Sequence, residues 1–555
     1  MNHTRITLFV CLIIAQLTLS AQNQNANLSD KSKLKAKAKK LMNKGKYFEA
    51  RDIYTQLVQI DSTDFNNNFE LGYLYSTATA DSSEKAILPF ERAIKYAGKK
   101  PKTLSYYFLA YTYLKNENYD KAIENFKNFL PSAKKGKQGK LLKAEVENAI
   151  KQAELAKEKL SKTNESDIKN QNELLSYFDD SEESYVKIEN IGRRINSKFG
   201  DYNTIIEPKS GLMFFITRRD GARNSYDDKN VEKTYFVLRK GENLTKPEKY
   251  ITPGTNPKSK IHYVLVMFTW DGNEVILYRK QKLFISKKNQ NNEWGKPKKI
   301  ASPINKFRTY QPSAVLSPDG KYMVFTSERN GNLGGLDLYI SERIGENKFS
   351  PAINLGENVN TIFNEDAPYF SPDGNYLYFS SKGHDGLGGY DFFKSEFKNG
   401  QVSKAVNLGL PFNSSGDDLY LFMNANGKEA FFASDRKGGY GDMDIYRINY
   451  LKSQPEFENC KIVDGEERQD IFKNIPLEVN AGNELTIKLE TETFRNYQIK
   501  NVNWMFNDLV LSSGNVAKIP FENKGEQKLR IELFLYNSST FNYDKQCFET
   551  SILVK

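Results

Sequence analysis

Residues 317–342 read SPDGKYMVFTSERNGNLGGLDLYISE, and residues 371–396 repeat the pattern as SPDGNYLYFSSKGHDGLGGYDFFKSE. Each copy contains a turn sequence, a short aromatic strand, a glycine-rich stretch and a second strand that begins at an aspartate. A third copy occupies residues 424–449, and two weaker copies begin near residues 208 and 269. Short apolar strands between turn signals are typical of all-β structure, so five copies of one unit predict five similar sheets.

A second sequence element precedes each copy, and its first occurrence lies upstream of the whole repeat region. It reads VKIENIGRRINSKFGD at residues 186–201 and PAINLGENVNTIFNED at residues 351–366, and nothing similar follows the last copy. A ring of sheets has no free edges when the first strand of the region completes the last sheet. We therefore predict a closed five-bladed β-propeller over residues 184–452, with a sixth, unrecognised blade as the alternative.

The paired glycines in each copy raise the question of a phosphate-binding loop. Such a loop needs the order G-x-x-x-x-G-K-[ST] leading into a helix, and neither the Lys-Ser/Thr pair nor the helix is present. We interpret the glycines as hairpin residues with positive φ, each pair followed by an aspartate that accepts hydrogen bonds from loop amides. The alternative is a calcium site at Asp385 and Asp391. The glycines are Gly334–Gly335, Gly388–Gly389 and Gly438–Gly439, and the aspartates are Asp337, Asp391 and Asp444.

Residues 30–162 carry a helical pattern that repeats three times. A small residue is followed four positions later by an aromatic residue, in the pairs Ala50 and Tyr54, Ala86 and Phe90, and Ala122 and Phe126. Paired helices approach closely at a small residue and fill the groove at a large one. The spacing resembles the tetratricopeptide repeat, which implies an α-solenoid with a concave face. The polar residues 163–183 read as a linker.

Residues 455–555 form a third region, in which strands alternate apolar and polar residues. VNWMFNDLVL at residues 502–511 is followed by GEQKLRIELFLYN at residues 525–537. This W-x-F strand and its successor resemble a polycystic-kidney-disease-type (PKD-like) immunoglobulin β-sandwich. Two cysteines of this region, Cys460 and Cys547, suggest a disulfide in an oxidising compartment. Zinc is the weaker interpretation, because it needs two more ligands and the histidines lie far upstream.

The N-terminal residues 1–21 read as a secretory signal peptide, with a mildly basic start, a short apolar core and small residues before Gln22. No later segment is long and apolar enough to cross a membrane. We therefore expect an exported protein in the periplasm or associated with the outer membrane, and no nucleic-acid partner. The net charge of +11 is concentrated in lysine-rich stretches such as residues 31–40 and 134–140. These stretches either face an acidic partner or anionic glycolipid, or form solvated helix faces.

The sequence contains no recognisable catalytic motif. Downstream of the signal peptide the only histidines are His262 and His384, and neither has a motif partner. G-x-S-x-G and H-E-x-x-H are both missing from the sequence. Carboxylates are abundant, but sequence spacing does not identify a glycosidase pair. We therefore expect a protein that is not an enzyme and has no cofactor.

The SPDG repeats resemble the propeller repeats of the TolB family of periplasmic proteins. The order of signal peptide, tetratricopeptide repeats, propeller with GGxDxY hairpins and small β domain resembles envelope proteins of Bacteroidota associated with type IX secretion and gliding. This resemblance implies a scaffold or adaptor that binds envelope or secretion-machinery proteins. Such relatives usually carry an OmpA-like domain, which has no counterpart in this sequence, so peptidoglycan anchoring by that route is not expected. The alternative is a glycan-binding or glycan-processing envelope protein that uses the propeller funnel.

Six residues are candidates for contacts with partner proteins. Three tyrosines are expected in the groove of the helical repeats, namely Tyr47, Tyr73 and Tyr111. Three residues are expected in exposed loops of the propeller, namely Arg329, His384 and Arg436. Packing inside the helical core is the alternative role of the tyrosines.

Overall fold

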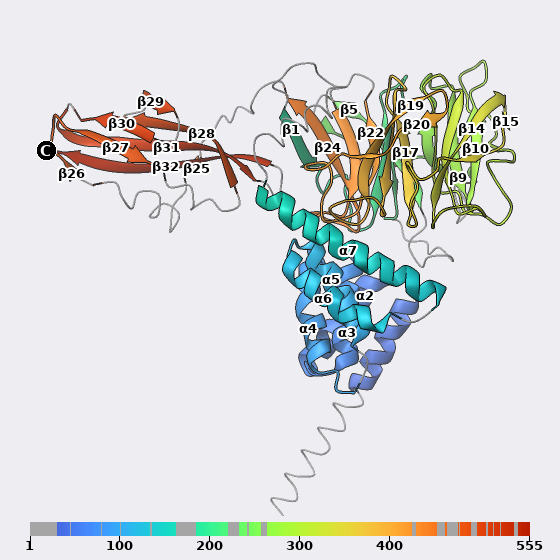
Figure 1. Ribbon diagram of the computed structural model, residues 1–555, viewed down its shortest axis with the longest axis horizontal. Helices are drawn as coiled ribbons and strands as arrows, with labels where there is room; N and C mark the ends of the chain where they lie inside the picture. The colour runs from blue at the N-terminus through green and yellow to red at the C-terminus, as the bar shows by residue number, and fades with distance from the viewer. Residues whose placement is uncertain are drawn as a thin grey trace, which may run out of the picture. The chain divides into compact units, whose positions relative to one another are not determined.

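The computed structural model (Figure 1) describes residues 30–44, 46–78, 80–99, 102–133, 136–162, 185–219, 232–240, 243–256, 263–424, 429–451, 461–462, 476, 478–489, 497–506, 509–513, 516–521, 523–537 and 542–555. The predicted signal peptide, the predicted linker at residues 163–183, His262 and Cys460 lie outside these residues. The chain divides into two compact units, of which the first (residues 1–157, 190–425 and 431–446) holds most of the helical region and most of the sheets of the middle region. The second holds the C-terminal strands. None of the described helices has the length and apolar character needed to span a bilayer.

The N-terminal region is helical, as the sequence predicts. Residues 30–43 form a helix, which is followed by α2 (Tyr47–Ile60), α3 (Phe65–Ala78), η1 (Ala80–Ala86), α4 (Ile87–Lys95), α5 (Thr103–Lys115), α6 (Tyr119–Phe129), η2 (Leu130–Ser132) and α7 (Lys137–Lys162). The three repeated alanines and the aromatic residues that follow them are fully buried. A Cβ atom at Gly72 would lie 2.7 Å from the Phe90 ring. Helices α3 and α4 therefore meet where a small residue faces a large one.

Five sheets follow the helices, in an order that the sequence also predicts. Their strand orders are β2-β3-β4-β7, β8-β9-β10-β11, β12-β13-β14-β16, β17-β18-β19-β21 and β22-β23-β24-β1. The strands are β1 (Tyr185–Asn190), β2 (Asp201–Ile206), β3 (Met213–Thr217), β4 (Lys233–Val237), β7 (Glu248–Lys249), β8 (Val264–Phe268), β9 (Glu274–Arg279), β10 (Lys282–Lys287), β11 (Lys298–Lys299), β12 (Ala314–Leu316), β13 (Tyr322–Ser327), β14 (Asp337–Gly345), β16 (Ile353–Asn354), β17 (Glu365–Phe370), β18 (Tyr376–Ser381), β19 (Asp391–Lys398), β21 (Val406–Asn407), β22 (Asp418–Met423), β23 (Glu429–Ser434) and β24 (Asp444–Leu451). Short additions are β5 (Arg239–Lys240) paired with β6 (Asn243–Leu244), β15 (Lys348–Phe349) on β14, and β20 (Gln401–Val402) on β19.

The first strands of the five sheets contact one another in a closed circle. β2 contacts β8, β8 contacts β12, β12 contacts β17, β17 contacts β22, and β22 contacts β2. Strand β1 precedes β2 in the chain but is the last strand of the sheet that begins with β22. The chain therefore closes the circle with its own N-terminal strand. We call these five sheets the ring.

An asparagine in the displaced N-terminal element joins this element to the last sheet. The Asn196 Oδ1 accepts a hydrogen bond from the Ile445 amide at 2.9 Å, and its Nδ2 donates to the Ile445 carbonyl at 3.0 Å. The same exchange occurs within later sheets, between Asn360 and Leu338 and between Asn413 and Phe392. The repeated element thus makes the same contacts in these three sheets, and its first copy makes them in the last sheet.

The glycine pairs of the hairpins have a different role from the one the sequence suggests. Of the six glycines only Gly438 has a positive φ, 87°, so the positive-φ interpretation is wrong for the other five. A Cβ atom at Gly334 would lie 2.2 Å from the Ile362 carbonyl carbon, and one at Gly388 would lie 2.3 Å from the Ser414 oxygen. These glycines let each hairpin touch the loop of the next sheet. The expected capping is confirmed, since the Leu333 amide donates to Asp337 at 2.7 Å and equivalent bonds reach Asp391 and Asp444.

The C-terminal unit is a separate set of strands. They are β25 (Lys461–Ile462), β26 (Glu478–Val479), β27 (Glu484–Lys488), β28 (Tyr497–Phe506), β29 (Leu509–Ser513), β30 (Val516–Pro520), β31 (Gly525–Asn537) and β32 (Asn542–Val554). One sheet has the order β25-β32-β31-β28-β29, with β26 also on β32, and β27 pairs with β30. Trp504 is fully buried between them and Phe506 packs at the edge of the same core. Both residues therefore point inward.

Cys547 lies on β32 and is fully buried. Strand β25 runs parallel to β32, with Ile462 opposite Cys547. Cys460 directly precedes β25 but lies outside the described residues, so its disulfide with Cys547 stays a prediction.

Candidate functional site

Two of the predicted partner-binding residues are buried in the ring. Arg329 and Arg436 are only 6% and 8% exposed, so their description as exposed loop residues is wrong. The Arg436 guanidinium donates to the Phe412 carbonyl and to Asp418, both at 2.7 Å. The Arg329 guanidinium donates to the Pro303 and Ile304 carbonyls at 3.0 and 2.7 Å. Both arginines hold loops of the ring together. The sequence conceals this role because a basic residue beside a glycine-rich hairpin is usually solvated.

His384 is also engaged inside the ring. Its ring nitrogen Nε2 lies 2.8 Å from the Val359 carbonyl, and its imidazole contacts the Phe393 ring at 5.0 Å between centroids. Burial lowers the pKa of His384. A neutral imidazole that donates to a carbonyl matches this environment, which is structural.

Tyr47 and Tyr73 pack within the helical region. Tyr47 lies against the buried cluster that contains Ala50 and Leu57. Tyr73 contacts the Phe108 ring edge to face, with centroids 5.4 Å apart. Neither tyrosine lines a described cavity. Their contacts therefore support the alternative role, which is packing inside the helical core.

Tyr111, on α5, lies in a cleft of about 480 Å³ that helices and ring form together. Its hydroxyl and that of Tyr107 each donate to the Glu145 carboxylate on α7 at 3.1 Å. Lining residues from the ring come from hairpins and neighbouring loops, among them Gly335, Gly388, Gly389, Ile362 and Asp417. We call this site the cleft. In the cleft, Tyr111, which the sequence predicts in the groove of the helical repeats, lies beside the glycine-rich hairpins of the ring.

Polar contacts fasten the helices to the ring beside the cleft. The Lys115 ammonium lies 2.8 Å from the Asp435 carboxylate, and the Asn148 amide donates to the Lys382 carbonyl at 2.8 Å. Burial disfavours the charged form of Lys115, but the carboxylates led by Asp435 outweigh it and raise the pKa of Lys115. The lysine is therefore a cation held between the helices and the ring. The cleft floor also contains Gln152, 4% exposed, whose Nε2 has no hydrogen-bond partner.

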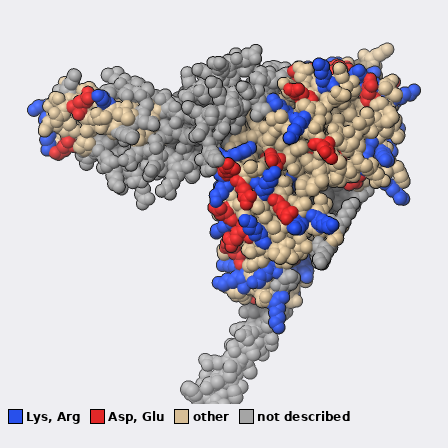
Figure 2. All heavy atoms as spheres, in the orientation of Figure 1, with Lys and Arg blue, Asp and Glu red and all other residues tan. Residues whose placement is uncertain are grey.

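The face of the helical region that Figure 2 shows carries no separate basic patch. Acidic and basic side chains are interspersed over the helical region. Lys31, in the first lysine-rich stretch, lies 2.6 Å from Asp61, and Lys157 of α7 pairs with Asp120. These contacts favour solvated helix faces over a site for an acidic partner.

The aspartates suggested for calcium have other partners. Asp391 accepts hydrogen bonds from the Leu387 and Gly388 amides at 2.9 and 3.1 Å, and burial raises its pKa. Asp385 pairs with Lys151 at 2.5 Å. Across the described residues no group of three or more His, Cys, Asp or Glu side chains is placed to hold a metal ion. The structure therefore gives no support to the calcium alternative.

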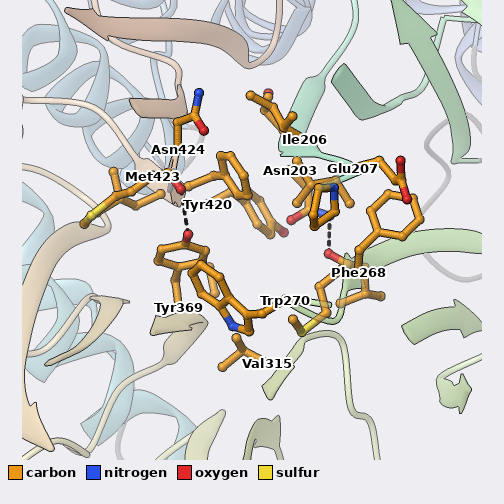
Figure 3. A pocket seen from close by; sticks show the side chains of 18 of the residues that line it. Asn203, Ile206, Glu207, Phe268, Trp270, Val315, Tyr369, Tyr420, Met423 and Asn424 are labelled. Atoms are coloured by element: carbon orange, nitrogen blue, oxygen red, sulfur yellow. Dashed lines mark hydrogen bonds between the residues drawn. The ribbon is translucent and has the colours of Figure 1, made fainter. Parts of the chain in front are cut away.

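A second cavity, of about 500 Å³, lies among the first strands of the ring. Aromatic side chains form much of its wall, and Figure 3 shows Trp270, Tyr369 and Tyr420 around it. The Trp270 and Tyr369 rings are 6.0 Å apart between centroids. We call this cavity the ring pocket. Trp270 could have been found from the sequence, because TWDG carries tryptophan where the SPDG copies carry proline.

No known protein family can be assigned from comparison. No family model and no curated protein matches the chain. Among solved structures, a glycosyl hydrolase from Bacteroides ovatus aligns over 47% of this chain and 86% of its own, with 12% identity and a TM-score of 0.30. An α-L-arabinofuranosidase from Lactobacillus brevis aligns over 46% of this chain and 92% of its own, with 13% identity and a TM-score of 0.29. Similarity of this degree does not transfer an activity.

Proposed function

We propose that this chain is a non-enzymatic scaffold or adaptor of the cell envelope that binds a segment of another protein in the cleft. In this proposal the helices are a tetratricopeptide α-solenoid and the ring is a five-bladed TolB-like β-propeller. The C-terminal unit is then a PKD-like β-sandwich. The repeated alanine–aromatic pairs, the closed circle of first strands and the buried Trp504 support these assignments.

The cleft is the observation that carries the proposal. Its walls come from two regions of sequence that the repeats predict as separate domains, and contacts such as Lys115–Asp435 join them across 320 residues. A groove built this way is closed on one side by helices and on the other by hairpins. In this proposal a single groove replaces the two separate partner surfaces expected from the sequence, and Tyr111 is the one predicted partner residue that lines it.

The chemistry of the cleft matches a peptide segment. Leu141 on α7 and Ile362 on the ring line it, and they remain 50% and 54% exposed. Apolar side chains of a partner can cover these residues, while the unpaired Gln152 amide can donate to a peptide carbonyl. The three carboxylates that line the cleft are engaged, Glu145 by two tyrosines, Asp435 by Lys115 and Asp417 by Lys382. This engagement favours binding over acid–base catalysis.

The envelope location and the link to type IX secretion rest on the sequence resemblance. They belong to the proposal because the signal-like residues 1–21 and the order of modules support them. Envelope or secretion-machinery proteins are therefore the partners to look for.

The test is affinity purification of the tagged full chain after crosslinking in cells, followed by mass spectrometry. An Ile362→Asp variant places a charge in the cleft and should reduce recovery of the partner at least tenfold. Phe307→Asp is the matched control. Phe307 is the equivalent position in the preceding copy of the element, because it follows Asn305 by two residues as Ile362 follows Asn360. The Phe307 residue is 80% exposed and does not line the cleft.

Equal recovery with both variants would contradict the proposal. Recovery of the protein alone, or with glycan only, would also count against it.

A further inference from the structure

The ring pocket opens at the opposite end of the ring from the cleft. Its lining includes Pro208 and Gly211 from the turn after β2, Trp270 from the turn after β8, and Asn424 after β22. The cleft is lined by hairpins that follow the second strand of a sheet. In an antiparallel sheet, successive turns lie at opposite ends. The two cavities are therefore separate sites.

Three of the nine non-glycine residues with positive φ in the described part of the chain line the ring pocket. Asn203, Ala367 and Tyr420 line it and have positive φ values of 52°, 51° and 59°. They lie on β2, β17 and β22, which are neighbours in the circle. A left-handed backbone costs a non-glycine residue about 1 kcal/mol or more, and such residues gather at binding sites. Three such residues around one pocket indicate that the shape of this pocket serves binding.

Two of the three strained residues, Asn203 and Ala367, lie at bulges. The register of β2 against β3 shifts between Tyr202 and Ile205, and that of β17 against β18 shifts between Asp366 and Tyr369. A bulge takes its extra residue out of the ladder and redirects its side chain. Residues 203–204 and 367–368, at these two bulges, line the cavity.

Thr204 supplies an unused hydrogen-bonding group. Its side chain is 2% exposed and lines the ring pocket, and its Oγ1 has no hydrogen-bond partner. A buried hydroxyl without a partner is unfavourable, so a ligand hydroxyl at this position would stabilise it.

Charged ligands are poorly matched to this site. Glu207, at the edge of the pocket, is paired with Lys288 at 3.2 Å. The Arg239 guanidinium lies over the Phe431 ring at 5.9 Å. The other lining side chains are uncharged, and five of them are aromatic. Among these, the Tyr369 ring lies 5.6 Å from the Phe422 ring between centroids.

We propose that the ring pocket binds a small neutral saccharide. A sugar ring has an apolar face that can lie against Trp270 or Tyr369, and hydroxyls that can reach the Thr204 Oγ1. A hydrocarbon or a quaternary ammonium group would use the aromatic walls but leave the hydroxyl unpaired. The site serves binding and not hydrolysis, because Glu207 is the only carboxylate among the described lining residues and a glycosidase needs two.

The test is calorimetric titration of the full chain with three neutral disaccharides, namely cellobiose, maltose and N,N′-diacetylchitobiose. We expect one of them to bind with a stoichiometry of one. Thr204→Val should weaken that binding about fivefold, the value of one hydrogen bond. The same variant should leave the thermal midpoint unchanged or raised, because the hydroxyl it removes has no partner in the folded protein.

Two further variants keep the test independent of the cleft. Trp270→Leu should weaken binding more than tenfold, whereas Phe307→Asp, at the other end of the ring, should leave it unchanged. Failure of all three sugars to bind would overturn the proposal. Binding that neither pocket variant weakens, or binding of decanol but of no sugar, would overturn it as well.

Discussion

One position of the ring shows how a buried charge depends on its partner. Asp418 accepts two hydrogen bonds from Ser414 and a third from the Arg436 guanidinium. In the preceding sheet Glu365 occupies the same place, but Gly383 stands where the arginine would be. A Cβ atom at Gly383 would lie 1.9 Å from the Thr361 Oγ1, so this sheet cannot accommodate the arginine without rearrangement.

Glu365 is therefore a buried acid without a cation. Burial raises its pKa to about 7, against the lowering effect of hydrogen bonds from Thr361 and Ser381. Its ordinary value of 4.5 applies to the unfolded chain. Between these values the folded state holds a proton that the unfolded state has lost, so stability falls as pH rises from about 4.5 to 7.

We predict that Glu365→Gln removes most of this pH dependence. Between pH 5 and pH 8 the wild-type free energy of unfolding should fall by up to about 3 kcal/mol relative to the variant. Chemical denaturation at several pH values measures the difference. Glu357→Gln, at an exposed position, is the control and should follow the wild type. Parallel profiles for wild type and Glu365→Gln would show that Glu365 is ionised throughout.

The hairpins show which part of an element the sequence can predict. Their position between the second and third strands follows from the turn sequences and the strand length. The reason why these hairpins need glycine does not follow from these signals, because the contact that requires it is made with the next sheet. Gly334 faces Ile362, and no local pattern reports a contact between segments that far apart.

We predict that Gly334→Ala strongly lowers the thermal midpoint. The new Cβ would lie 2.2 Å from backbone atoms of Ile362, which cannot move as a flexible side chain can. Gly320→Asn is the matched control. Gly320 has a φ of 70° and open space around it, and asparagine tolerates this backbone conformation. Thermal unfolding followed by circular dichroism compares the two. A midpoint lowered equally in both variants would contradict the close contact with Ile362 as the reason for glycine at position 334.

At the scale of the whole molecule, the sequence predicts modules better than it predicts sites. Helical repeats, a series of similar sheets and a C-terminal β region are all visible as periodic patterns. The cleft is not, because Tyr111, Gln152 and Ile362 belong to different patterns and meet only when the first unit is folded. The ring pocket escapes detection for a similar reason, since the bulges that shape it leave no sequence motif.

The central claim is that helices and ring form one binding surface for a protein segment. Deleting the helices would test whether the modules act independently. The deletion would, however, expose the hairpins of the ring and remove the cleft at the same time. A probe placed in the intact protein is more direct. Leu141 and Ile362 provide one exposed position on each wall.

The measurement is photo-crosslinking in living cells with benzoylphenylalanine at position 141, 362 or 307, each in the full chain. We expect one shared protein adduct at positions 141 and 362, and none of that mass at position 307. An adduct at position 307 alone, different partners at the two cleft positions, or no protein adduct at either would contradict the central claim.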